Sequence, residues 1–466
     1  MPTENQEPKG SSPTLLYGLP VAPAQFLFVL TGVYFVKFGT DVLLVAPSSL
    51  ALLYGLSRLW DAISDPMAGF LSDRTRAAFG RRRTWILGST VPMALTALMV
   101  WHPPEALTGT PLLIWLGLAL FAFSTAYTAF EVPHNALGAE LSDRSDVRAR
   151  LFGMRAWMMV AGTYAALTLG IGAIRTAQSP RESATWLIAG IGFLYVLSVV
   201  LTIGRLKERP EFAGLGGRSP IRAYRDLLAN QHARTILTVI FCEYVGTGGA
   251  TVLIAYLYQY VLHAENLTEV AFVVMGIAQV LSVPLWVRLA RRMEKARIWQ
   301  GAMALAAVGC LLQFGVGVFG GSALLFVGVS FLYAFGASAT HVLGPAILAD
   351  VIDSDELKTG ERKEGVYFAS WHFTRKAMQG SMIVVAGLAL EASGFVPNAV
   401  QSRTTSLTIL GLATLAPTIG YALGALLLLR YRLKGERLAE LREALDQRRA
   451  RDRAESGAGL EPGTGP

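Results

Sequence analysis

The sequence predicts an all-α membrane protein with twelve transmembrane helices arranged in two six-helix halves. Of the 466 residues, 53% are hydrophobic and only 16% are charged, whereas soluble proteins carry about 25% charged residues. Twelve apolar runs follow one another from Pro20 to the region of Tyr431. Each has about 18 residues or more, enough to cross the hydrocarbon core of a bilayer. Clusters of arginine and lysine recur after every second run. Together these observations exclude a soluble two-domain protein.

The basic clusters also predict the topology. They follow the second, fourth, sixth, eighth and tenth runs, and the connections around 46–49, 103–108, 263–267 and 320–322 contain no lysine or arginine. Arg175, Arg181 and Arg403 are exceptions. Because lysine and arginine accumulate in cytoplasmic loops, we expect a multi-pass protein of the bacterial inner (plasma) membrane with both termini in the cytoplasm.

A polar connection over 205–234 separates the two halves. It contains several glycines and a proline, which are typical of a linker. The predicted divisions are a cytoplasmic tail over 1–20, a first half over 21–204, the connection, a second half over 235–432, and a tail over 433–466. The spacing of Leu438, Leu441 and Leu445 predicts an amphipathic surface helix in that last tail, followed by disorder.

The first span, predicted over Val21–Val45, contains Lys37 and Asp41, which are four residues apart and can pair within one helix. Such a pair near a membrane face and a role in transport both remain open interpretations. The only two cysteines, Cys242 and Cys310, lie in later apolar runs, so no disulfide framework is expected.

The second span contains the most informative stretch, which runs from Arg58 to an arginine block at Arg81–Arg83. Asp61 and Asp65 are four residues apart within it, so a helix places both carboxylates on one face. An uncompensated carboxylate at the centre of a bilayer helix costs about 2.5–3.5 kcal/mol. Pro66 cannot donate to the carbonyl of Ala62, which leaves a further free oxygen close by. We therefore expect a proton or a small hard cation there; the alternative is an ordinary salt bridge at a wet helix end.

Later spans contain isolated polar residues. The third span is predicted from Trp85 to Trp101 and the fourth from Leu112 to Leu141. Glu131 lies in the fourth span, and Arg155 of the fifth is either its partner or a cation that reaches the headgroups. Glu243 and His341, in spans seven and ten, are interpreted as packing residues.

The eleventh span opens with Trp371, His372, Arg375 and Lys376. Arg375 is expected to face the headgroups. A buried Lys376 requires an acidic partner, which Asp61 or Asp65 of the other half is placed to supply.

Taken together, these residues resemble a known family. The stretch WDAISDPMAGFLSDRTRAAFGRRR is similar to the signature of the glycoside-pentoside-hexuronide:cation symporters, the melibiose-permease-like branch of the major facilitator superfamily. EVPHNAL, ADVIDSDE and EGVYFASWHFTRK match further family segments, in the family's order, between about Tyr17 and Lys376. The resemblance implies the major facilitator fold.

The resemblance also implies roles for individual residues. The coupling-cation site would consist of Asp61, Ser64, Asp65 and Thr128. The substrate site would comprise Gln25, Glu131, Asn135, Arg155, Trp371 and Lys376. Gating would involve the family's loop motif, represented by Gly69, Asp73, Arg74, Gly80, Arg81, Arg82 and Arg83. The sequence departs from the sugar symporters at three of these positions, where Gln25 replaces an acid, Asn135 a tryptophan and Ser64 an asparagine.

These residues lead to a functional hypothesis. We expect a cation-coupled symporter of a polar organic solute, most simply a sugar or glycoside, that works by alternating access. A lysophospholipid or other amphiphile symporter is the alternative, and a non-transporting membrane sensor is a remote one. No nucleophile, metal-cluster or nucleotide-loop motif indicates an enzyme.

The expected coupling ion is Na⁺ or H⁺, with Li⁺ as a further candidate. We expect no cofactor and no metal beyond that ion. The expected partners are a small-molecule substrate and the lipid bilayer, without nucleic acid, and the protein is expected to be a monomer.

Overall fold

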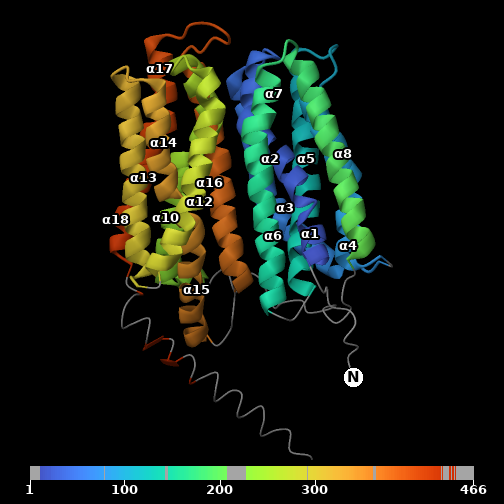
Figure 1. Ribbon diagram of the computed structural model, residues 1–466, viewed down its shortest axis with the longest axis vertical. Coiled ribbons are helices and arrows are strands. Elements are labelled where there is room, and N and C mark those ends of the chain that lie inside the picture. The colour runs from blue at the N-terminus through green and yellow to red at the C-terminus, as the bar shows by residue number, and fades with distance from the viewer. Residues whose placement is uncertain are drawn as a thin grey trace, which may run out of the picture.

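The computed structural model describes residues 11–77, 79–141, 145–206, 227–290, 292–359 and 364–431, together with single positions between 433 and 447. Every regular element in the described residues is helical, and the helices form two bundles that stand side by side (Figure 1). The prediction of an all-α protein in two halves is therefore confirmed. The predicted tail helix lies almost entirely outside the described residues, and the connection between the halves lies mainly outside them.

The first bundle contains the helices up to residue 205. They are α1 (Ser11–Gly18), α2 (Val21–Asp41), α3 (Pro47–Arg74), α4 (Arg81–Trp101), α5 (Gly109–Glu140), α6 (Ser145–Ala165), a π-helical turn η1 (Ala166–Gly170), α7 (Ile171–Arg175) and α8 (Pro180–Arg205). The acid pair lies in α3, which continues through Pro66 without a break.

The second bundle begins after the connection. It contains α10 (Gln231–Thr247), α11 (Ala250–Tyr256), a π-helical turn η3 (Leu257–Val261), a 3-10 turn η4 (Glu265–Leu267), α12 (Thr268–Ala290), α13 (Lys295–Val318), α14 (Ala323–Ala337), α15 (Ala339–Thr359), α16 (Glu364–Ala392), α17 (Arg403–Leu410), a π-helical turn η5 (Gly411–Leu415) and α18 (Ala416–Leu429). The interruption between α10 and α11 lies at Gly248 and Gly249.

Ten helical segments within the described residues are long and apolar enough to cross a membrane. The first of them begins at Thr14 rather than Val21, because α1 runs almost directly into α2. Neither α3 nor α16 is among the ten. They have 28 and 29 residues, so each is roughly 40 Å long, but both carry several charged side chains. The number twelve therefore stays a prediction.

The two bundles meet most closely along α3 and α16. A Cβ atom added to Gly380 would lie 2.8 Å from the carbonyl oxygen of Gly55, and one added to Gly55 would lie 2.6 Å from the carbonyl oxygen of Gly380. Only glycine permits so close an approach of two backbones. This contact lies less than a helical turn from Arg58, so it fixes the acid pair of α3 at the interface between the halves.

Candidate functional site

Asp61 is a deeply buried carboxylate whose nearest cation comes from its own helix. Its exposed fraction is 1%, and Arg58 Nη1 lies 3.0 Å from Asp61 Oδ2. The guanidinium also donates to Ser124 Oγ of α5 at 2.9 Å. Its central carbon lies 4.6 Å from the ring centroid of Phe28 and 5.0 Å from that of Tyr54. These contacts stabilise a cation that would be costly to bury alone.

Asp65, one turn further along α3, has a partner from the other half. Lys376 of α16 donates to Asp65 Oδ2, so the predicted pairing of this lysine with the acids is confirmed. The opposite oxygen, Oδ1, accepts a hydrogen bond of 2.9 Å from the Thr128 hydroxyl. Ser64 Oγ in turn donates to Thr128 Oγ1 at 3.3 Å. The four residues predicted for the cation site therefore lie together.

The composition of this cluster suits a small hard cation. Among the described residues, neither Asp61 oxygen accepts a hydrogen bond of good geometry, although Ser124 lies beside it. Arg58 supplies a positive charge beside Asp61 Oδ2 at 3.0 Å, and the carboxylate oxygens retain capacity to bind a proton or a further positive ion. Hydroxyl oxygens of Ser64 and Thr128 complete an all-oxygen set of the type that hard cations prefer.

Three of the predicted substrate residues form a second polar cluster. Arg155 Nη2 of α6 lies 2.5 Å from Glu131 Oε1 of α5, so the predicted pairing of these two is confirmed. Asn135 Nδ2 donates to the same Glu131 oxygen at 3.1 Å. The side chain of Glu131 remains 24% exposed. This carboxylate and the guanidinium can together contact neighbouring hydroxyl groups of a bound solute.

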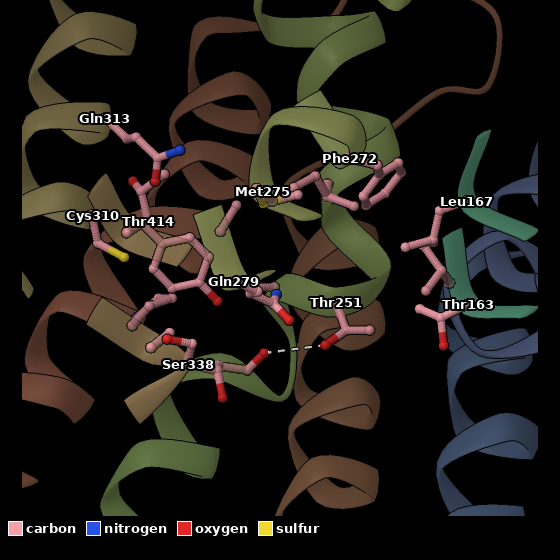
Figure 2. A pocket seen from close by; sticks show the side chains of 18 of the residues that line it. Thr163, Leu167, Thr251, Phe272, Met275, Gln279, Cys310, Gln313, Ser338 and Thr414 are labelled. Carbon is pink, nitrogen blue, oxygen red and sulfur yellow. Dashed lines mark hydrogen bonds between the residues drawn. The ribbon is translucent and has the colours of Figure 1, made fainter. Parts of the chain in front are cut away.

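Gln25 lies at the wall of a large cavity. The Tyr127 hydroxyl donates to Gln25 Oε1, and Gln25 Nε2 donates to Thr163 Oγ1, both at 3.2 Å. Gln25 and Thr163 line a cavity of 610 Å³ that extends into the second half. Figure 2 shows Thr163 and Leu167 on one side of it and Gln279 and Gln313 on the other. The cavity is large enough for a sugar or a small glycoside.

Trp371 lies elsewhere. It is 6% exposed and belongs to the apolar core of the second half, where its ring centroid lies 6.3 Å from that of Trp299. Of the six predicted substrate residues, Gln25 lines the cavity, whereas Glu131, Asn135, Arg155, Trp371 and Lys376 do not. The Trp371 ring packs against Gly344, and its contact with substrate stays a prediction.

The predicted gating residues surround the connection between α3 and α4. Gly80 has a φ of 99°, a conformation that favours glycine, and immediately precedes α4. Arg82 Nη1 lies 2.6 Å from Ser72 Oγ, and Arg83 Nη2 lies 2.6 Å from the carbonyl oxygen of Ile203. Arg74 stacks on Phe70 at 3.7 Å. Gly69 lies in α3 and Arg81 is the first residue of α4. The side chain of Asp73 is outside the described residues.

The opposite end of the bundle carries a network between the halves that the sequence did not indicate. Lys37 lies 2.7 Å from Asp41, as predicted, and also contacts Gln259 and Glu265. Tyr260 donates to Asp41 Oδ1 at 2.9 Å.

A second ion pair reinforces that end. Arg175 Nε of α7 lies 3.0 Å from Glu269 Oε1 of α12. Arg175 is an exception to the pattern of basic loops, and this pair across the halves gives it a structural role. At this end the two halves are held together by charges as well as by packing.

The sequence did not indicate the surroundings of three residues in this region. Arg58 lies three residues before Asp61, and that spacing alone places them on one helix face. Glu243 was interpreted as a packing residue, but it lines the cavity. Arg375 was expected to face the headgroups, yet it interacts with Tyr244 and lies near His341 of the second half.

Comparison with known proteins gives a consistent result. The family model described as "MFS/sugar transport protein" matches residues 16–435. The isoprimeverose transporter of Lactiplantibacillus pentosus is 25% identical over 93% of this chain and 92% of its own length. The sodium-dependent lysophosphatidylcholine symporter 1-A of Danio rerio is 25% identical over 89% of this chain and 84% of its own length.

The fold is shared with a solved transporter structure. The crystal structure of a D-xylose-proton symporter superimposes with a TM-score of 0.69 at 11% identity, covering 90% of this chain and 97% of that chain. At this low identity the match demonstrates a common fold only.

Proposed function

Because the chain belongs to the MFS/sugar transport protein family, we propose that it is a cation-coupled symporter of a sugar or glycoside that works by alternating access. It is a membrane transporter and not an enzyme. The observation that carries the proposal is the contact of Lys376 with Asp65, since this ion pair joins the two halves at the acid pair itself. A cation bound there would compete directly with that contact.

The proposed mechanism follows from charge balance. A cation that enters between Asp61 and Asp65 replaces Lys376 as the group that neutralises the negative charge of Asp65. Lys376 is then released from α3, and the halves lose one of the contacts that hold α3 against α16. Solute bound near Glu131, Arg155 and Gln25 moves with the cation when the halves rock, because the loaded site no longer needs the lysine.

The proposed orientation places the arginine block of α4 in the cytoplasm of a bacterial cell, with both termini on that side. The network of Lys37, Asp41 and Glu265 then closes the extracytoplasmic end. Na⁺ and H⁺ are both proposed as coupling ions, because a serine at position 64 and a threonine at position 128 offer oxygen ligands without selecting one ion.

Uptake by purified protein in liposomes tests this function. The panel contains monosaccharides, glycosides and lysophospholipids, and each is assayed with Na⁺, Li⁺ and pH gradients varied independently. We expect at least one sugar or glycoside to accumulate in a cation-dependent manner. If solute accumulated to the same extent with and without each ion gradient, the proposed coupling would be contradicted. If only lysophospholipid accumulated, the proposed sugar or glycoside substrate would be wrong.

The acid pair provides the matched variants. Asp61→Asn and Asp65→Asn should abolish cation-driven uptake, because each removes a charge that the ion needs. Asp65→Asn should lower the unfolding midpoint less than Asp61→Asn, which leaves Arg58 buried without its anion. Glu105→Gln is the control, since the Glu105 side chain is 81% exposed and lies far from the acid pair in sequence. Unchanged cation stimulation in both Asn variants would refute the assignment of the site.

One observation favours the amphiphile as second candidate. Part of the cavity wall is apolar and flexible, with Met159, Val160 and Met275 among its residues, and Val160 is 39% exposed. Methionine side chains adapt to acyl chains of varied shape. The same uptake panel separates this candidate from a sugar, because a lysophospholipid would then compete with sugar uptake or replace it.

A further inference from the structure

Glu243 is a buried carboxyl group that the proposed mechanism does not use. It lies on α10 with an exposed fraction of 4%, and it lines the cavity of the second half. Its Oε2 accepts a hydrogen bond of 3.0 Å from the Thr340 hydroxyl. Tyr421 of α18 is its other polar neighbour. Both neighbours are uncharged groups.

Among the described residues, no lysine or arginine forms an ion pair with Glu243. The titratable groups that face this region are Tyr244 on α10, Cys310 on α13, Tyr333 on α14, His341 on α15, Arg375 on α16 and Tyr421 on α18. Arg375, the permanent cation among these groups, interacts with Tyr244. Among the described ion pairs, none includes Glu243.

This environment distinguishes Glu243 from the acids of the first half. Asp61, Asp65 and Glu131 each have an arginine or lysine within ion-pair distance. An ionised carboxylate buried without such a partner costs several kcal/mol. The neutral acid avoids that cost, and it can still accept from Thr340 while its own O–H is free to donate. Protonation of Glu243 would therefore remove the cost of burying its charge.

The backbone next to Glu243 packs closely against two other helices of the second half. Gly248 and Gly249, which separate α10 from α11, keep helical dihedral angles. A Cβ on Gly248 would lie 2.9 Å from the Cα of Gln379 in α16, and one on Gly246 would lie 2.7 Å from the carbonyl oxygen of Ala416 in α18. This close packing holds the Glu243 carboxyl group at the wall of the cavity.

We propose that Glu243 is a proton-binding site of the transport cycle, located in the second half and separate from the Asp61/Asp65 site. Its O–H bond forms with a proton taken from water on one side of the membrane. The bond breaks when water in the cavity accepts that proton on the other side. Coupling of this proton to solute movement rests on the proposed symport, whereas its binding to Glu243 does not.

Infrared difference spectroscopy of the purified protein in lipid nanodiscs tests the binding of the proton. Protonated carboxyl groups absorb apart from carboxylates, so pH titration reveals acids that keep a proton at neutral pH. We expect such a band in the wild type and in Glu105→Gln, and its loss in Glu243→Gln. Glu243→Asp should shift the band, which keeps the test valid if the Gln variant folds poorly. Identical spectra for all four proteins would overturn the proposal.

Transport measurements test the coupling. Glu243→Gln mimics the neutral acid, so it should retain exchange of solute between two sides at equal concentration but lose accumulation driven by a pH gradient. Accumulation under a pH gradient equal to that of the wild type would overturn the coupling role. If the wild type transports no solute in the panel, the proposed function fails, and the infrared result still decides whether Glu243 holds the proton.

Discussion

At the scale of single residues, the buried charges are arranged as separate pairs that share one interface. Arg58 neutralises Asp61 within α3, and Lys376 neutralises Asp65 from α16. The arginine is fixed by Ser124 and two aromatic rings. The lysine has a flexible stem and a compact charge, which suits a group that must detach. In the proposed mechanism Arg58 is therefore the permanent partner and Lys376 the exchangeable one.

Substitution of Arg58 should lower the stability of the protein, because Asp61 would lose its cation. Arg58→Gln leaves Asp61 buried without its cation, a change that costs about 3–5 kcal/mol in buried pairs. We expect a clear drop in the thermal unfolding midpoint in detergent, and a smaller drop in the double variant Arg58→Gln/Asp61→Asn than the sum of the two single variants. Additive effects would show that the two side chains are not coupled.

Lys376→Met makes the contrasting prediction. It leaves Asp65 with its Thr128 hydrogen bond and 27% exposure, so the loss of stability should be smaller than for Arg58→Gln. The apparent affinity for the coupling cation should rise, because the lysine no longer competes for Asp65. The measurement is the cation dependence of thermal stabilisation, and a weakened cation response would contradict the competition.

At the scale of elements, α3 and α16 behave as one packed unit because glycines allow their backbones to touch. The Gly55 and Gly380 contact lies close to Arg58, so the distance between the helices also determines whether Lys376 reaches Asp65. A change in helix spacing of a fraction of an ångström would thus affect charge pairing. Packing and electrostatics at this interface cannot be altered independently.

Gly380→Ala tests this packing. The added Cβ would overlap the carbonyl oxygen of Gly55, and overpacking of this kind costs about 1–3 kcal/mol. We expect a lower unfolding midpoint and slower uptake. Gly190→Ala in α8 is the matched control, since a Cβ there meets nothing within 4 Å and alanine favours helix by up to about 1 kcal/mol. Equal effects of the two substitutions would argue against a tight interface.

At the scale of the whole molecule, the end opposite the arginine block is closed by contacts between the halves. Lys37, Asp41, Gln259, Glu265 and Tyr260 form one group, and Arg175 with Glu269 forms another. Alternating access requires these contacts to break once in each cycle. Lys37 and Asp41 are 4% and 11% exposed, and Arg175 and Glu269 are 21% and 17% exposed, so opening this end would return these charged groups to water, which offsets part of the loss of their contacts.

A reversible cross-link at this end should stop transport. In a Cys242→Ser/Cys310→Ser background, Arg175→Cys and Glu269→Cys place one thiol on each half. A short bifunctional methanethiosulfonate reagent should abolish uptake, and reductant should restore it. Either single cysteine variant treated in the same way serves as the control. Full uptake by the cross-linked protein would mean that these elements do not separate during transport.

Much of the architecture followed from local sequence properties. Hydrophobic run length and the positions of basic residues predicted the membrane class and the division into halves, because each depends only on neighbouring residues. The spacing of Asp61 and Asp65 placed both on one helix face for the same reason. The burial of Trp371 against Trp299 did not follow from the sequence, because a family match identifies a position in the chain, whereas burial depends on how a helix is rotated within the bundle.

The sequence by itself determined that an acid pair lies in the second predicted span and that the negative charge of this pair must be neutralised. Only the tertiary structure decided which cations do so, since Lys376 and Asp65 are separated by 311 positions. It also decided that Glu243 lines the cavity and forms no ion pair with any residue that the structure describes. Periodicity along one helix describes the faces of that helix, but the partner on each face depends on the packing of all the others.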